Sequence, residues 1–277
     1  MIDERQAAHP RDVKGYGTDA LRENFLIERI FVPGEIALTY SHYDRMIVGG
    51  ATPTATPLTL QPYPPTGTPF FLARRELGVI NLGGAGSVTI DGEVFALPPL
   101  DALYVGLGAK DVSFASADAA APAKFYLTSA PAHREAPHQV IRNDEANTLH
   151  LGSPETSNKR IIRQYIMPDT TGTNQLVMGM TALEPGSVWN SMPCHTHTRR
   201  MEAYLYFDLD PAHRVFHFMG QPQETRHLLV ANEQAVISPN WSIHCGCGTS
   251  NYSFVWAMAG DNVAFTDMDA APVETLR

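Results

Sequence analysis

The stretch PGSVWNSMPCHTHTRRMEAYLYFDL, residues 185–209, contains the features that decide the fold and the chemistry of this chain. His195 and His197 are two residues apart, and on a β-strand such residues point to the same face. Glu202 follows five residues after His197, a gap that suits a short bend through 198–201 and the start of a neighbouring strand. We therefore expect β-structure that brings two imidazoles and one carboxylate together.

A third imidazole is expected further along the chain, from His244 in the segment SPNWSIHCGCG. Three imidazoles and one carboxylate suit a divalent ion such as Zn²⁺, Fe²⁺, Mn²⁺, Co²⁺ or Ni²⁺. This ligand set, His195, His197, Glu202 and His244, leaves positions for water or substrate oxygens, which is typical of a catalytic site. The remaining histidines are interpreted as ordinary hydrogen-bonded residues: His42, His133, His138, His150, His213, His217 and His227.

The three cysteines lie beside these candidate ligands. If His195 and His244 point inward, strand alternation turns Cys194, Cys245 and Cys247 the other way. They are therefore interpreted as small apolar residues packed outside the barrel lumen, not as ligands or disulfide partners.

Short runs rich in strand-forming residues, separated by turn residues, continue along the chain on both sides of this segment and predict an all-β protein. Asp91-Gly92, within SVTIDGEVFAL (87–97), is typical of a two-residue hairpin turn. One helix is expected, with Thr18 as its N-cap and Leu21 and Phe25 on its apolar face. The other predicted runs are 36–50, 71–84, 124–130, 174–183, 202–209, 215–220, 224–230, 233–239 and 252–260.

Residues 131–159 are polar, rich in turn residues and without sustained periodicity. They are the best candidate for a linker between two β-units of similar size, and we expect domains at 1–150 and 151–277. The total of 277 residues, with 44% hydrophobic and 18% charged, is ordinary for globular domains of this size.

The net charge of −9 argues against a nucleic-acid or anionic-membrane partner, although it allows a small anionic substrate. No stretch is long and apolar enough for a transmembrane helix, and the first residues lack the pattern of a secretory signal. A cytoplasmic protein is expected.

The pattern His195-x-His197-x4-Glu202, followed by Pro239-x4-His244, resembles the metal motifs of the cupin superfamily. Longer segments, among them RRELGVINLGGAGSVTIDG and NEQAVISPNWSIHCGCGTSNYSFVWAMAGDN, resemble the 5-keto-4-deoxyuronate isomerase (4-deoxy-L-threo-5-hexosulose-uronate ketol-isomerase) family over nearly the whole chain. The resemblance implies a bicupin of two jelly-roll-like β-barrels with few short helices. The first barrel is expected to be metal-free, and the second to hold one zinc ion. It also implies a homohexamer that acts in the breakdown of pectin and related polyuronates.

The implied activity is that of a ketol-isomerase, an intramolecular oxidoreductase. It would convert 5-dehydro-4-deoxy-D-glucuronate to 3-deoxy-D-glycero-2,5-hexodiulosonate through a metal-stabilised enediol. Glu224 and Arg226, on one face of the polar run QETRHLLV, are candidates for the base and for the partner of the substrate carboxylate. An exposed, ion-paired strand end explains these two residues equally well.

Other residues could also serve the substrate. Tyr204 and Tyr206 share the face of Glu202 and could donate to sugar hydroxyls, or pack the barrel. Arg199 and Arg200 could reach the substrate, or lie in a solvated loop. Lys159, Arg160 and Arg163 could reach a subunit interface or the cavity mouth.

Two rival functions use the same ligands. A cupin dioxygenase would hold Fe²⁺ there and consume oxygen. A non-catalytic sugar-binding cupin would bind its ligand without turnover.

Overall fold

The computed structural model describes residues 3–277 and divides into two compact units, each built mainly from β-sheets. Of the described residues, the first unit comprises 3–4, 29–146 and 165–177, and the second comprises 5–28, 147–164 and 178–277. The units therefore exchange short segments, whereas the domains expected from the sequence, 1–150 and 151–277, are contiguous.

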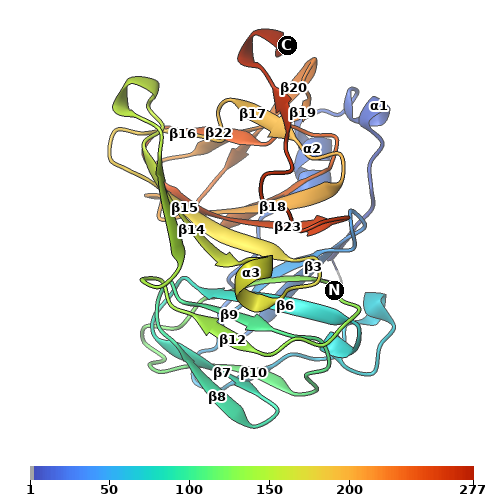
Figure 1. The fold of residues 1–277 in the computed structure, drawn as a ribbon, viewed down its shortest axis with the longest axis vertical. Coiled ribbons are helices and arrows are strands. Elements are labelled where there is room, and N and C mark those ends of the chain that lie inside the picture. The colour runs from blue at the N-terminus through green and yellow to red at the C-terminus, as the bar shows by residue number, and fades with distance from the viewer. Residues whose placement is uncertain (1–2) are drawn as a thin grey trace. The chain divides into compact units, whose positions relative to one another are not determined.

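The strands of the first unit form two sheets (Figure 1). The seven-stranded sheet has the order β1-β3-β4-β11-β6-β9-β12 and the four-stranded sheet the order β5-β10-β7-β8. Their bounds are β1 Asp3–Arg5, β3 Ile36–Ser41, β4 Ile47–Ala51, β5 Leu58–Thr59, β6 Arg75–Asn81, β7 Gly86–Ile90, β8 Glu93–Leu97, β9 Ala102–Val105, β10 Val112–Ser116, β11 Phe125–Pro131 and β12 Gln139–Ile141.

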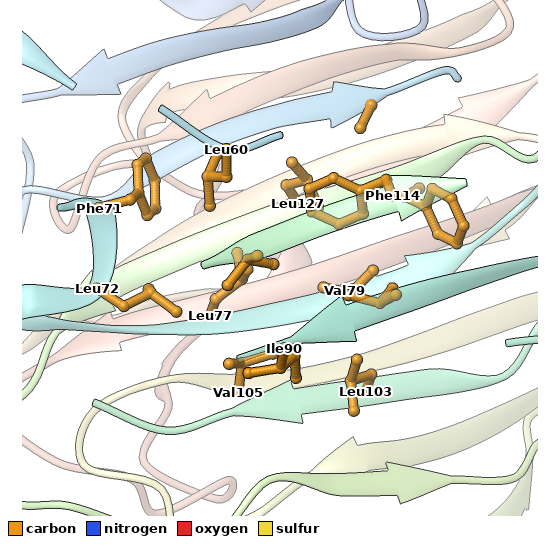
Figure 2. Close-up of a cluster of buried hydrophobic side chains, with 14 of the residues drawn as sticks. Leu60, Phe71, Leu72, Leu77, Val79, Ile90, Leu103, Val105, Phe114 and Leu127 are labelled. Atoms are coloured by element: carbon orange, nitrogen blue, oxygen red, sulfur yellow. The ribbon is translucent and has the colours of Figure 1, made fainter. Parts of the chain in front are cut away.

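Apolar side chains from these two sheets pack into one core (Figure 2). Leu77 and Val79 on β6 alternate with residues of the opposite face, as do Val88 and Ile90 on β7, and all four are buried. The predicted hairpin is confirmed: β7 and β8 pair with Ile90 opposite Glu93, and Asp91 has a φ of 47°.

The second unit repeats the arrangement of a large and a small sheet (Figure 1). The large sheet has the order β13-β14-β15-β23-β18-β21-β2, the small one β16-β22-β19-β20, and a two-stranded ribbon pairs β17 with β24. Their bounds are β2 Leu26–Ile27, β13 Asn147–Leu151, β14 Arg160–Ile166, β15 Val177–Leu183, β16 Trp189–Asn190, β17 Cys194–Thr196, β18 Arg200–Phe207, β19 Val215–Gln221, β20 Glu224–Val230, β21 Gln234–Ser238, β22 Cys245–Gly248, β23 Ser253–Gly260 and β24 Asp269–Ala271.

Helices are few and short, as expected. They are α1 Pro10–Val13, α2 Thr18–Phe25 and α3 Pro168–Thr171, with 3₁₀ turns at Pro64–Thr66, Phe71–Ala73, Pro154–Thr156 and Val273–Thr275. Helix α2 buries Leu21 and Phe25 as predicted, but its N-cap is Gly17, so Thr18 is already helical and the predicted side-chain cap is wrong. No helix among residues 3–277 has the length and hydropathy needed to cross a membrane.

Residues 131–159, expected to link two β-units, include the change from the first unit to the second at 146–147, but they have regular structure of their own. They contain β12 and β13, and β13 pairs with β14 in antiparallel register, with Leu149 opposite Ile162. The polar composition that suggested a linker reflects the edge position of β13, where most side chains are exposed.

Candidate metal centre and its cavity

Four potential ligands converge in the second unit, and they are the four expected from the sequence. His195 lies on β17, Glu202 on β18, His197 just after β17, and His244 just before β22. One ligand atom from each lies within 4.8 Å of the others, and this is the one such group found among the described residues. The group could hold one metal ion.

The contacts within the group are short. His244 Nε2 lies 3.0 Å from His195 Nε2 and 3.0 Å from a Glu202 carboxylate oxygen, and His197 Nε2 lies 3.1 Å from the same oxygen. His197, Glu202 and His244 are buried, while His195 is partly buried.

The protonation of His197 shows why such a group suits a cation. Its Nδ1 lies 2.7 Å from the backbone carbonyl oxygen of Asp267, which can only accept, so the proton of the neutral ring is on Nδ1. The lone pair of Nε2 then faces the Glu202 carboxylate oxygen, which is also an acceptor. A cation between the two relieves this repulsion, so the donor set fits a divalent metal.

Burial and neighbouring charges act on the ionisable groups of the site. Burial, and then the charge of His244, lower the pKa of His195 to about 3, which keeps its imidazole neutral and able to ligate. Burial alone would raise the pKa of Glu202. The charge of His244 and the close imidazoles of His197 and His244 outweigh it and hold this pKa below its ordinary value.

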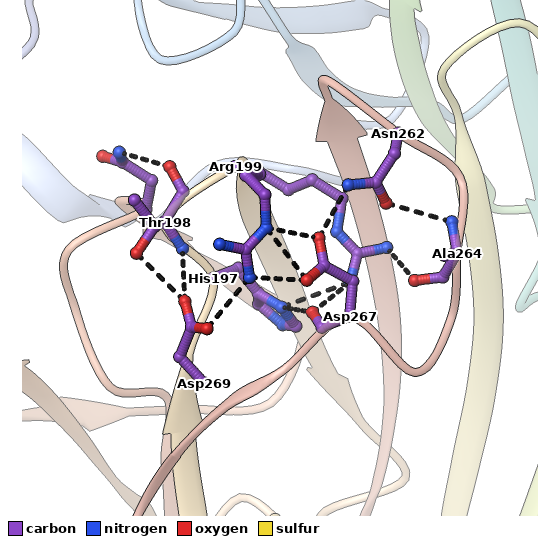
Figure 3. A network of polar contacts seen from close by, with 9 residues as sticks. His197, Thr198, Arg199, Asn262, Ala264, Asp267 and Asp269 are labelled. Carbon is purple, nitrogen blue, oxygen red and sulfur yellow. Dashed lines mark hydrogen bonds and ion pairs between the residues drawn. The ribbon is translucent and has the colours of Figure 1, made fainter.

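A network of arginines and aspartates holds the loop that carries the Asp267 carbonyl (Figure 3). Arg199 Nε donates to both carboxylate oxygens of Asp267, at 2.9 and 2.8 Å, and its Nη2 donates to Asp269 at 2.9 Å. Hydrogen bonds from Arg199 hold the pKa of both aspartates below the usual range. Arg200, fully buried, donates to the carbonyl oxygens of Ala264 and Asp267 at 2.8 and 2.7 Å.

Both arginines therefore stabilise the loop that contacts His197. Neither arginine lines the cavity described next. Arg200 Nη2 also lies 3.2 Å from His197 Nδ1, a contact that follows because both atoms donate to the same carbonyl of Asp267. Nothing in the sequence indicates this role for Asp267, since it acts through a backbone atom in a segment that has the composition of an ordinary polar loop.

A cavity of about 240 Å³ opens beside the ligand group and is lined by three of its members, His195, His197 and Glu202. Its walls come from β13, β14, β15, β18 and β23 and from the loop before β24. They are mainly apolar, with Phe254, Trp256 and Met258 on β23. Tyr204 lines the cavity on the same strand as Glu202, as strand alternation predicted, with its hydroxyl 3.3 Å from Ser191 Oγ. Burial raises the pKa of Tyr204 well above its ordinary value, so its hydroxyl keeps its proton.

The second predicted tyrosine and the cysteines lie outside this cavity. Tyr206 lies within 2.8 Å of His217 Nδ1 and packs against Tyr252. Cys194 and Cys245 are buried in a small apolar cluster, and no cysteine belongs to the ligand group.

The structure does not bring Glu224 and Arg226 to the metal group. Both lie on β20, where they pair with each other at 2.8 Å, and Arg226 also donates to the carbonyl of Lys14 at 2.8 Å. They line a separate small hollow with α1. Their shared face was predicted correctly, but the geometry corresponds to the alternative of an ion-paired strand end, and their catalytic role gains no support.

Two barrel-like pairs of sheets, with a ligand group in the second, define a bicupin with one candidate metal centre. The chain belongs to the KduI/IolB family, whose sequence model matches residues 35–273. It is 59% identical over 273 residues to 4-deoxy-L-threo-5-hexosulose-uronate ketol-isomerase 2 of Rhizobium meliloti (strain 1021), covering 99% of this chain and 96% of that one. It is 52% identical over 278 residues to the ketol-isomerase of Escherichia coli O45:K1 (strain S88 / ExPEC), covering 100% of both chains.

Solved structures support the fold. An IolB-like protein from Salmonella typhimurium LT2 superimposes with a TM-score of 0.68 at 17% identity, covering 87% of this chain and 94% of that one. Oxalate decarboxylase of Bacillus subtilis, a protein with Mn(II) centres, gives a TM-score of 0.56 at 11% identity, covering 79% of this chain and 70% of that one.

Proposed function

We propose that this chain is a 4-deoxy-L-threo-5-hexosulose-uronate ketol-isomerase. It converts 5-dehydro-4-deoxy-D-glucuronate to 3-deoxy-D-glycero-2,5-hexodiulosonate. The observation that carries the proposal is a four-residue ligand group open to a cavity of about 240 Å³, in a chain 52–59% identical over its whole length to proteins of that name. Such a cavity approaches the size of small-molecule sites.

His195, His197, Glu202 and His244 would hold the metal ion, which when bound supplies a Lewis acid that stabilises negative charge on the sugar oxygens. We propose zinc on the basis of the family resemblance, and the donor set of three nitrogens and one oxygen suits it among other divalent ions. An aldose–ketose conversion moves a proton from C2 to C1 and another between the two oxygens.

Protein groups in the cavity can take part in moving the proton between the two sugar oxygens. Tyr204 holds its proton and lies next to Ser191, so its hydroxyl can donate to a sugar oxygen and exchange protons with it. Among the described residues that line the cavity, Glu202 is the one carboxylate. The pair Glu224 and Arg226, expected as base and clamp, therefore has no part in this proposal.

The physiological setting rests on family resemblance. On that basis we propose a cytoplasmic homohexamer acting in the breakdown of pectin and related polyuronates. The charge of −9 favours a small anionic sugar as the partner, and not nucleic acid or an anionic membrane surface.

The test is conversion of 5-keto-4-deoxyuronate in D₂O, followed by NMR, by the metal-loaded protein and by a His195→Ala, His197→Ala variant. We expect the 2,5-diulosonate to form, with deuterium at C1, and both to disappear in the variant. His150→Ala is the matched control, because His150 is exposed on β13 and outside the ligand group.

Metal content and oxygen consumption are measured on the same samples. Fully metal-loaded protein that leaves the substrate unchanged would overturn the isomerase. Oxygen uptake would then favour the dioxygenase, and substrate binding without turnover would favour a sugar-binding cupin.

A further inference from the structure

The cavity beside the ligand group carries one fixed positive charge. Among the described residues that line it, Arg160 is the one lysine or arginine. It is the first residue of β14, and its neighbour on the same face, Ile162, lines the cavity as well. A single cation in a mainly apolar cavity is a specific feature, because charges are rarely placed in such walls without a partner.

Arg160 has no carboxylate partner among residues 3–277. Arg160 Nη1 donates a hydrogen bond to the backbone carbonyl of Asn158, at 2.9 Å. Three other cations of the same unit have carboxylate partners: Lys159 pairs with Glu184 at 2.8 Å, Arg199 with two aspartates, and Arg226 with Glu224.

The guanidinium remains charged although it is partly buried. Burial lowers the pKa of Arg160 from its ordinary value, and the nearby Tyr204 phenol opposes this change. A cation that is half removed from water and unpaired attracts an anion more strongly than an exposed one does.

The spacing between Arg160 and the ligand group suits a short linear acid. β14 and β18, which carry Arg160 and Glu202, are separated by β15 and β23 in one sheet, so their axes are about 14 Å apart at a strand spacing of about 4.8 Å. A six-carbon chain extends about 6 Å from C1 to its carboxyl carbon. A metal–oxygen contact of about 2 Å at one end and a charged hydrogen bond of about 2.8 Å at the other fill most of the remainder.

We propose that Arg160 binds the carboxylate of the substrate and makes the cavity selective for uronates over uncharged sugars. The inference rests on the proposed function, since it assumes that C1 and C2 of the sugar face the ligand group. Arg160 then fixes the far end of the molecule and sets which carbons lie beside the ligands.

The kinetic test compares 5-keto-4-deoxyuronate with its uncharged C6 amide, for the metal-loaded wild type, Arg160→Gln, Arg160→Lys and Lys159→Gln. We expect Arg160→Gln to lower kcat/KM for the acid on the order of 10²-fold, chiefly through KM, and to leave the amide little changed. Arg160→Lys should recover part of the preference, because an ammonium keeps the charge without the bidentate geometry. Lys159→Gln, which removes an adjacent charge outside the cavity, should keep the full preference.

Equal losses for acid and amide in Arg160→Gln would overturn the proposal and leave Arg160 a structural role. An unchanged preference for the acid would overturn it as well. Metal content and the tryptophan fluorescence spectrum of each variant establish that the ligand group and the second unit are intact.

A binding experiment tests this inference separately from the proposed function. D-Glucuronate and its uncharged amide are titrated calorimetrically into wild type and Arg160→Gln. Tighter binding of the acid that is lost in Arg160→Gln supports the anion site even if the wild type isomerises nothing, whereas equal binding of both probes by the wild type overturns it.

Discussion

Histidine 217 gives a quantitative prediction about pH and stability. It lies on β19, is fully buried, and shares a hydrogen bond of 2.8 Å between Nδ1 and the Tyr206 hydroxyl. Its Nε2 is buried without a hydrogen-bond partner in the described part of the chain. Burial, followed by the charge of His244, lowers its pKa to about 3.

The consequence for stability follows from proton binding in the two states. An unfolded histidine has a pKa of about 6.5, so below that pH the unfolded chain binds a proton that folded His217 refuses. The stabilising contribution is complete above pH 6.5 and decreases as the pH falls from there toward 3. Between pH 7 and pH 5 this one residue should cost the folded protein about 2 kcal/mol.

The assay is urea unfolding at pH 7 and pH 5, followed by tryptophan fluorescence. Trp189, Trp241 and Trp256 all lie in the second unit, so the signal reports the unit that contains His217. His217→Asn keeps a hydrogen-bonding atom near the position of Nδ1 but cannot titrate, so only the wild type should lose these 2 kcal/mol.

The difference in unfolding free energy between wild type and His217→Asn is the decisive quantity. His195 titrates alike in both proteins and cancels. His150→Asn, at an exposed position of the same unit, is the control and should follow the wild type. A difference that stays constant between pH 7 and pH 5, to within about 0.5 kcal/mol, would refute the reasoning.

Three further predictions concern other parts of the molecule. Glu76, fully buried in the first unit, accepts from the backbone N–H groups of residues 174–176, so Glu76→Gln should cost about 3–6 kcal/mol through at least two lost charged hydrogen bonds. Hydrogen exchange of these amides checks this, and unchanged protection would contradict it. Arg199→Ala should weaken zinc binding by about 10–100-fold, because the loop that fixes the His197 tautomer loses its anchor. A competitive chelator titration measures this effect, with Arg214→Ala as the control. Removing the metal with a chelator should lower the unfolding free energy of the second unit, measured by fluorescence, by about 2.7 kcal/mol relative to protein at a hundredfold excess of metal over Kd, and added zinc should restore it.

The alternation rule explains why the centre of the site was accessible from sequence. His195, His197 and Glu202 lie on or beside short strands, where a period of two fixes the direction of each side chain. The same rule placed Tyr204 and Tyr206 on the face of Glu202, but only Tyr204 of the two lines the cavity, a difference that the rule does not predict. The Asp91-Gly92 turn was predictable for a similarly local reason.

Contacts between distant segments were not accessible in this way. Glu224 and Arg226 share a strand face as predicted. Whether that face points into the barrel depends on how β20 pairs with β19, which the sequence of β20 alone does not determine. Arg160 was one of three adjacent cations with nothing to single it out until β14 was placed three strands from Glu202. Asp267 acts through its carbonyl, an atom that every residue possesses.

The loop between β23 and β24 has a consequence for redesign of the enzyme. Phe265 and Met268 from this loop form part of the cavity wall, while Asp267 between them fixes the tautomer of His197. Mutations there that enlarge the cavity for a bulkier sugar will also alter the hold on the metal, so the two properties cannot be tuned separately. Leu151 on β13 and Ile162 on β14 line the same cavity and belong neither to the ligand group nor to this loop, so a library aimed at new substrates should begin with them.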